Sequence, residues 1–213
     1  MPETTYHITA TSAITNHGTF KNSQLIFEKQ EVKVGELLSS IFQDLGVKYP
    51  KFYKMDHLGK LGFLAAELLL TGNFQPGKYK PEEVGIVLSN TSSSLDADLK
   101  YFSSVGTIPS PALFVYTLPN IVIGEISIRH NLKGENAFFI CERFDPGLLE
   151  KYVSNLFNNN NLQACICGWV EVIGEVYQAV LYLIEKEPAF DDDNQVVILN
   201  NENLLKIYQT YNG

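Results

Sequence analysis

Cysteine is the residue type of this chain best suited to covalent chemistry, and Cys141 is the one placed to carry it out. A thiol at a helix N-terminus, where its pKa falls, can attack a thioester carbonyl. Cys141 follows the apolar run Ala137–Ile140 and precedes Asp145-Pro146, a typical helix start. Within an apolar strand, however, the pKa of the thiol would rise. We therefore interpret Cys141 as structural and keep the nucleophile as the alternative.

The other groups with chemical potential have simpler structural interpretations. Cys165 and Cys167 are separated by one residue, without a second Cys/His pair, which favours strand packing over a zinc or redox site. Ser92–Ser94 with Asp96 could form a nucleophile and its partner, but a polar loop that caps the next helix is favoured. Asp191–Asp193 lacks the spacing of a calcium loop. We predict no metal site and no cofactor.

The four histidines are His7, His17, His57 and His130, and all lie at or before position 130. We interpret each as a surface or turn residue and not as a general acid or base.

The pattern of apolar residues predicts an α/β fold in a single domain over residues 1–213, with a mixed sheet of about five strands layered with helices. The predicted strands are Tyr6–Ile14, Val84–Ser89, Ala137–Cys141, Gln163–Val170 and Gln178–Glu185, with a short one at Val196–Leu199. The predicted helices are Gly35–Gly46, Asp56–Thr71, Leu118–His130, a helix from Pro146 to about Phe157, and Glu202–Tyr208.

The composition of the chain limits the classes of partner that it can bind. The net charge is −8, which argues against nucleic acid or an anionic membrane, because both select for basic faces. No apolar run approaches the ~20 residues of a membrane span. The odd number of cysteines and the absence of a signal-like N-terminus predict a reducing, cytoplasmic location.

Five segments together resemble the N-terminal half of the β-ketoacyl-acyl carrier protein synthases, which have the thiolase-like fold. Those segments are YHITATSAITNHG (6–18), KFYKMDHLGKLGFLAAELLLT (51–71), VGIVLSNTSSS (84–94), PSPALFVYTLPNIVIGEISIRHNLKG (109–134) and Cys165–Val170. They occur in the family's order and at its spacing.

The resemblance implies a degenerate active site. In that family a nucleophilic cysteine lies in a small-residue elbow such as TACSS, and family spacing places this position at Arg143 or Phe144. The family's catalytic histidines belong to a second half of similar fold. An isolated half is also expected to leave an apolar face unpaired.

The resemblance therefore predicts a non-catalytic ketosynthase-like protein, a homo- or hetero-oligomer that associates with a full-length ketosynthase or an acyl carrier protein. Small ketosynthase-like proteins of aryl-polyene and flexirubin-type clusters are similar. Lys51, Lys54 and Lys60 could dock a carrier protein or merely solvate a helix face. Two alternatives stay open: a small thioester-handling acyltransferase that uses Cys141, and half of a split 3-oxoacyl-acyl carrier protein synthase.

Overall fold

The computed structural model describes residues 5–28, 31–106, 110–159, 162–188 and 196–212. Pro109, the first residue of the 109–134 segment, and the acidic triplet Asp191–Asp193 lie outside the described residues.

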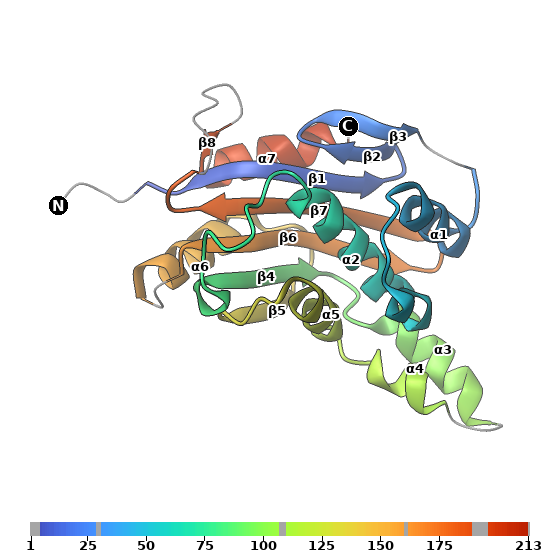
Figure 1. Ribbon diagram of the computed structural model, residues 1–213. Helices are drawn as coiled ribbons and strands as arrows, with labels where there is room; N and C mark the ends of the chain where they lie inside the picture. The colour runs from blue at the N-terminus through green and yellow to red at the C-terminus, as the bar shows by residue number, and fades with distance from the viewer. Residues whose placement is uncertain (1–4, 29–30, 107–109, 160–161, 189–195, 213) are drawn as a thin grey trace.

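An eight-stranded mixed sheet forms the centre of the molecule (Figure 1). Its order is β3-β2-β1-β7-β6-β4-β5, and β8 pairs with the start of β1. β4 runs parallel to β5 and β6, whereas the remaining pairs are antiparallel. The strands are β1 His7–Thr15, β2 Gly18–Lys21, β3 Gln24–Glu28, β4 Val84–Asn90, β5 Asn136–Ile140, β6 Ala164–Ile173, β7 Val176–Glu185 and β8 Val197–Ile198.

Helices cover both faces of the sheet. The ribbon view shows α1, α2 and α5 on one face, α6 and α7 on the other, and α3 and α4 extending past the sheet (Figure 1). The helices are α1 Val34–Asp44, α2 His57–Leu70, α3 Leu95–Val105, α4 Pro111–Val115, α5 Ile121–His130, α6 Pro146–Asn159 and α7 Asn201–Thr210, with short 3-10 helices at Pro50–Lys54 and Pro81–Glu83.

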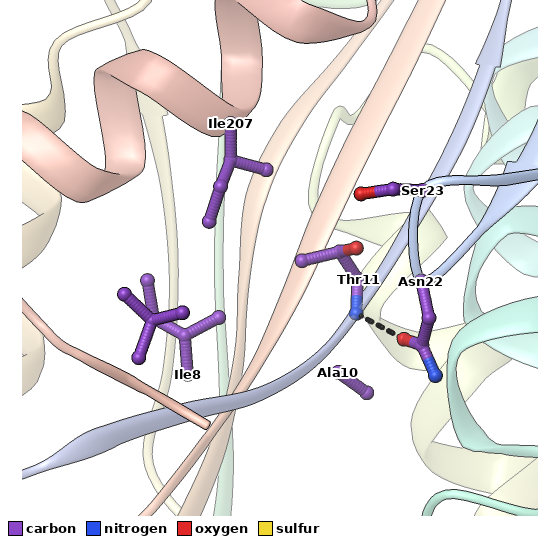
Figure 2. Close-up of a pocket in the computed structure, with 7 residues that line it drawn as sticks. Ile8, Ala10, Thr11, Asn22, Ser23 and Ile207 are labelled. Carbon is purple, nitrogen blue, oxygen red and sulfur yellow. Dashed lines mark hydrogen bonds between the residues drawn. The ribbon is translucent and has the colours of Figure 1, made fainter. Parts of the chain in front are cut away.

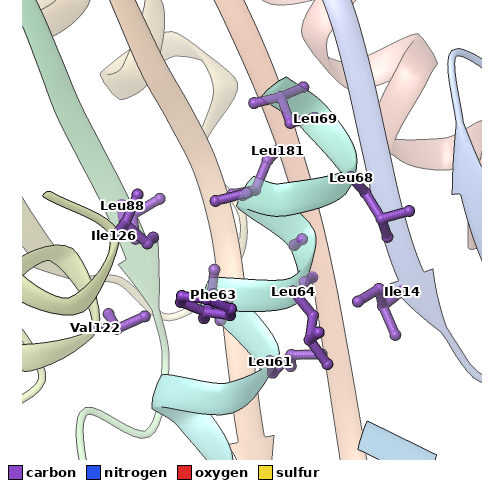
Figure 3. Packing of buried hydrophobic residues seen from close by; sticks show 14 of the residues in the cluster. Ile14, Leu61, Phe63, Leu64, Leu68, Leu69, Leu88, Val122, Ile126 and Leu181 are labelled. Carbon is purple, nitrogen blue, oxygen red and sulfur yellow. The ribbon is translucent and has the colours of Figure 1, made fainter. Parts of the chain in front are cut away.

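The helix α2 is the centre of the larger core cluster (Figure 3). Asp56 caps its N-terminus by accepting the Gly59 N–H at 2.8 Å. Its apolar residues are buried on nearly every side, because the sheet lies beneath it and α5 beside it. Gly62 permits the close approach of α5, since a Cβ at this position would collide with Val122.

The predicted elements are confirmed in type and near position, and the sheet is larger than expected. Two strands, β2 and β3, were not predicted. They form an edge hairpin in which Leu25 and Ile26 are exposed, and Phe20 and Phe27 pack against different core clusters, so the short strands show no simple alternating pattern. The short helix α4 lies in a segment for which the sequence predicts no helix.

Candidate functional site at the start of α6

The expected nucleophile region lies where β5 ends and α6 begins. Cys141 follows β5 directly, is half-buried, and donates its backbone N–H to Asn90 O at 2.8 Å. Residues 141–146 line an open depression of about 480 Å³. The structure thus places Cys141 beside the N-terminus of α6, where thiol chemistry would be possible in principle.

The charge around this helix start opposes a thiolate. Asp145 caps α6 by accepting the Leu148 N–H at 2.9 Å. Burial raises the pKa of the Cys141 thiol, and the negative charge of Asp145 raises it further. The thiol therefore stays protonated near neutral pH and is a weak nucleophile.

Phe144 is the buried residue at the expected nucleophile position. Its ring stacks on Tyr208 of α7, with ring centroids 4.2 Å apart and planes 8° from parallel. Trp169 of β6 and Tyr182 of β7 each lie 6.3 Å from it, centroid to centroid. An aromatic cluster fills the place that the resemblance assigns to a reactive thiol.

Arg143, the other residue at the expected position, is exposed. Its guanidinium is a permanent cation that supplies neither a nucleophile nor a base at neutral pH. Neither Arg143 nor Phe144 can therefore act as the nucleophile.

None of the four histidines is among the described residues that line the depression. His57 lies at the start of α2, where burial and the neighbouring Lys100 lower its pKa. His130 lies at the end of α5, with its Nε2 3.2 Å from Glu67 Oε1. Both belong to ionic clusters on the other face of the sheet, so neither histidine can act as a base for Cys141.

The remaining candidates of the sequence have structural roles. Cys165 and Cys167 are fully buried in β6, and burial raises the pKa of each thiol. Ser94 Oγ donates to Thr117 O at 2.7 Å, while Asp96 binds Lys100 and the Gly174 N–H. Across the described part of the chain, no group of three or more His, Cys, Asp or Glu side chains could hold a metal ion.

The three lysines do not form one free basic patch. Lys51 pairs with the buried Glu125 at 2.9 Å, and the Nζ of Lys60 lies over the Phe52 ring. Lys54 is exposed. Two of the three thus have structural partners.

A second cavity of about 290 Å³ lies between β1, the β2–β3 turn and α7 (Figure 2). The close-up shows Ile8 and Ile207 on its apolar side, and Asn22 Oδ1 accepting the Thr11 N–H at 2.9 Å. The described residues that line it carry no titratable group, so we assign no chemistry to it.

Two residues of the site region were not anticipated. Tyr208 closes over Phe144 and donates its hydroxyl to Gln178 Oε1 at 3.0 Å. Glu171 holds the loop after β4 by accepting the N–H groups of Thr91 and Ser92, at 2.6 and 3.1 Å. Both contacts join segments at least 30 residues apart, so local sequence patterns carry no signal for them.

No protein-family model and no curated protein sequence matches the chain. In structure it is similar to "The ishigamide ketosynthase/chain length factor", with TM-score 0.65, 19% identity, and coverage of 88% of this chain and 63% of that one.

Two further solved structures have the same fold. One is a type II polyketide synthase acyl-carrier protein in complex with its ketosynthase bound to the hexaketide (TM-score 0.59, 16% identity, 86% of this chain and 62% of that one). The other is the ketosynthase ApeO in complex with its chain length factor ApeC from Xenorhabdus doucetiae (TM-score 0.55, 13% identity, 87% and 80%).

The chain therefore has the ketosynthase fold that the five sequence segments predicted. It spans less than two thirds of the length of the first two of these proteins. Among the described helices, none combines the length and apolar character needed to cross a bilayer.

Proposed function

We propose that this chain is a non-catalytic ketosynthase-like protein. It acts with a full-length β-ketoacyl synthase, an acyl carrier protein or both, in fatty-acid or polyketide-type biosynthesis of the aryl-polyene kind. The observation that carries the proposal is the buried Phe144–Tyr208 stack at the expected nucleophile position. The cap at Asp145 adds to it, because the carboxylate disfavours a thiolate at the same helix start.

The names of the similar structures support the proposed partners. Ketosynthases with a chain length factor appear twice among them, and a ketosynthase with its acyl-carrier protein once. A chain without a usable nucleophile fits the non-condensing role in such an assembly better than the condensing one.

The test has two parts. The purified chain is incubated with an acyl-acyl carrier protein and a malonyl-acyl carrier protein, and β-ketoacyl product is measured by mass spectrometry. We expect no product above the protein-free control. Gel filtration with a purified full-length ketosynthase from the same cell, and separately with its acyl carrier protein, should then give a complex with at least one of them. Condensation by the chain alone, or binding to neither protein, contradicts the proposal.

A second candidate function is thioester handling by Cys141, favoured by the position of this residue in the depression. An acyl-pantetheine probe distinguishes the two. Under our proposal the wild type is labelled no more than Cys141→Ser, because the thiol stays protonated. Labelling that depends on Cys141 would support the transferase.

The split-synthase alternative requires an apolar surface on α6 and α7, where a separate half would pack. The outward residues of these helices are mostly polar, with Leu205 the exposed apolar exception. Examples are Lys151, Asn155, Asn158, Glu202, Lys206 and Gln209. This surface favours solvent contact over a buried interface.

A further inference from the structure

A third cavity, of about 320 Å³, lies where α2 and α5 end and β4 begins. Rings and apolar side chains make up most of its wall, among them Phe74, Tyr79, Pro81 and Val84, and His130 adds an imidazole. Small-molecule sites have volumes from about 300 Å³ upward and are mainly apolar, with few polar groups. The cavity matches that description.

The cavity is separate from the depression at Cys141. Val84 is the first residue of β4 and lines the cavity, whereas Asn90 is the last and accepts the Cys141 N–H. A strand of this length spans about 20 Å. The two sites therefore lie at opposite ends of β4, and the cavity is no part of the expected nucleophile region.

Backbone hydrogen bonds hold both sides of the cavity in place. The Lys78 N–H closes a β-turn by donating to Gln75 O at 3.2 Å, and Gly77 supplies the positive φ of 81° that this turn requires. On the other side, the Lys133 N–H donates to Pro81 O at 2.8 Å, which ties the chain after α5 to the start of β4. The cavity is therefore preformed, and a ligand does not have to order its walls.

The charged groups around the cavity are already paired. Tyr79 donates its hydroxyl to the buried Glu185 at 2.7 Å, and Lys78 Nζ lies 3.2 Å from the same carboxylate. Arg129 donates to both carboxylate oxygens of Glu67, at 2.6 and 3.3 Å. A charged ligand would lose hydration in the cavity without gaining a free counter-ion. The site therefore favours an uncharged ligand.

His130 is the hydrogen-bonding side chain that such a ligand would meet between the rings. Its Nε2 lies 3.2 Å from Glu67 Oε1, so the carboxylate favours the proton on this nitrogen. In the neutral imidazole Nδ1 is then an acceptor, which suits a ligand hydroxyl that donates. Phe74 and Tyr79, with ring centroids 6.0 Å apart, offer aromatic surface for a flat ring.

We propose that this cavity binds a small, uncharged aromatic molecule with a hydroxyl group, that is, a phenol. Its ring packs against Phe74 and Tyr79, and its hydroxyl donates to His130 Nδ1. Neither the nucleophile position nor an assembly partner takes part in this binding, so it stands or falls separately from the proposed function.

The experiment titrates the full chain with 2-naphthol at about pH 7.5, where this phenol is uncharged, and follows two-dimensional amide NMR spectra of the isotope-labelled protein. We expect saturable shifts with a Kd below about 1 mM, largest over residues 74–84 and 130–134. The matched anion, 2-naphthoate, should bind at least about tenfold more weakly. Shifts that do not saturate, shifts centred elsewhere, or equal binding of the anion overturn the proposal.

Phe74→Ala tests the ring contact and should weaken 2-naphthol binding by at least about tenfold. Phe102→Ala is its matched control, because it removes a 78% exposed ring from α3, outside the cavity, and should leave the Kd unchanged. Circular dichroism checks that both variants fold. Equal loss of affinity in the two variants would show that the ring does not bind in the cavity.

His130→Phe tests the hydroxyl contact and should raise the Kd by about fivefold, because it removes the acceptor. The variant should fold, since Arg129 still pairs with Glu67. His17→Phe, a change at an exposed turn residue, is the control and should bind as the wild type does. If His130→Phe binds as tightly as the wild type, the hydroxyl assignment is wrong. If either cavity variant fails to fold, the position and saturation of the wild-type shifts decide.

Discussion

At the scale of single residues, the site is defined by a ring where the resemblance expects a thiol. Phe144 is buried among Tyr208, Trp169 and Tyr182, which come from three different elements. Such a side chain stabilises the fold through apolar burial and ring contacts. The position has thus become part of the core.

Phe144→Ala should lower the free energy of unfolding by about 3 kcal/mol, because it removes a buried ring and leaves a cavity. Urea unfolding followed by circular dichroism measures this loss. The neighbouring Arg143→Ala is the matched control and should change stability by less than about 0.5 kcal/mol, since Arg143 is exposed. Equal effects of the two substitutions would show that Phe144 does not hold the cluster together.

The sequence predicts this position from the resemblance but gives no account of its surroundings. Spacing from the family segments predicts Arg143 or Phe144, and Asp145-Pro146 correctly predicted the start of α6. The partners of Phe144 come from residues 169, 182 and 208, and no periodic pattern links these to residue 144. Contacts of this kind depend on how the sheet and α7 are packed together.

Asp56 should make stability depend on pH. Burial raises the pKa of this carboxyl from 3.8 to about 6. The folded protein therefore holds a proton that the unfolded chain releases near pH 4. The resulting stability is fully present below about pH 4 and is lost as the pH rises through about 6, a change of about 3 kcal/mol.

Asp56→Asn is the matched variant, because its side-chain oxygen can still accept the Gly59 N–H. Denaturant unfolding at intervals from pH 4 to pH 7 should show the stability of the wild type falling relative to the variant. Parallel curves would mean that Asp56 titrates at its ordinary pKa in the folded protein.

At the scale of elements, α3 and its ionic cluster form a unit that the sequence indicated only in part. The polar loop Ser92–Ser94 was expected to cap the next helix; Ser94 does stand at the N-cap of α3, but its side chain makes no capping hydrogen bond and its Oγ donates to Thr117 O instead. The outward direction of Leu95, Leu99 and Phe102 could not be predicted, because an apolar stripe normally marks the buried face. The contact of Asp96 with the Gly174 N–H and the burial of Asp96 and Ala97 show which face is inward.

Asp96→Ala should loosen α3, because it removes the acceptor for Lys100 and for the Gly174 N–H. We expect amide hydrogen exchange over residues 95–105 to accelerate by at least about tenfold, which corresponds to about 1.4 kcal/mol, while exchange in α2 changes little. Asp98→Ala is the control on the same helix. Its carboxylate has only a 3.4 Å contact with Ser94 Oγ, so exchange should stay near the wild-type rate. Similar acceleration in both variants would mean that loss of a negative charge near the start of α3 causes the effect, and not loss of the Asp96 contacts.

At the scale of the whole molecule, the two faces of the sheet are covered by different means. The cluster around α2 covers one face, and α6 with α7 covers the other. We expected an isolated half of the ketosynthase fold to leave an apolar face unpaired. In the structure α7 packs beside α6 on its face of the sheet, and among the described residues several exposed large apolar side chains lie on α3 and α4.

The helix α7 is held from several directions. Tyr182 donates its hydroxyl to Leu204 O at 2.9 Å, and Thr11 Oγ1 lies 2.7 Å from the Tyr211 hydroxyl. The Asn201 N–H donates to Glu150 of α6 at 3.0 Å. Leu204 itself is fully buried. This helix therefore belongs to the core of the domain and is not an appendage.

Removal of α7 should consequently disrupt the folded state of the remaining chain. A chain of residues 1–199 exposes Phe144, Tyr182 and the apolar side of α6. We therefore expect the shortened chain to bind a hydrophobic fluorescent dye strongly and to lose cooperative unfolding. The full chain should unfold in one transition without any added protein. The control is Lys206→Ala, which changes an exposed residue of α7 and should leave that transition unaltered. If residues 1–199 unfold as cooperatively as the full chain, the sheet face beside α6 does not need α7, and it would then be free to receive a separate half-domain.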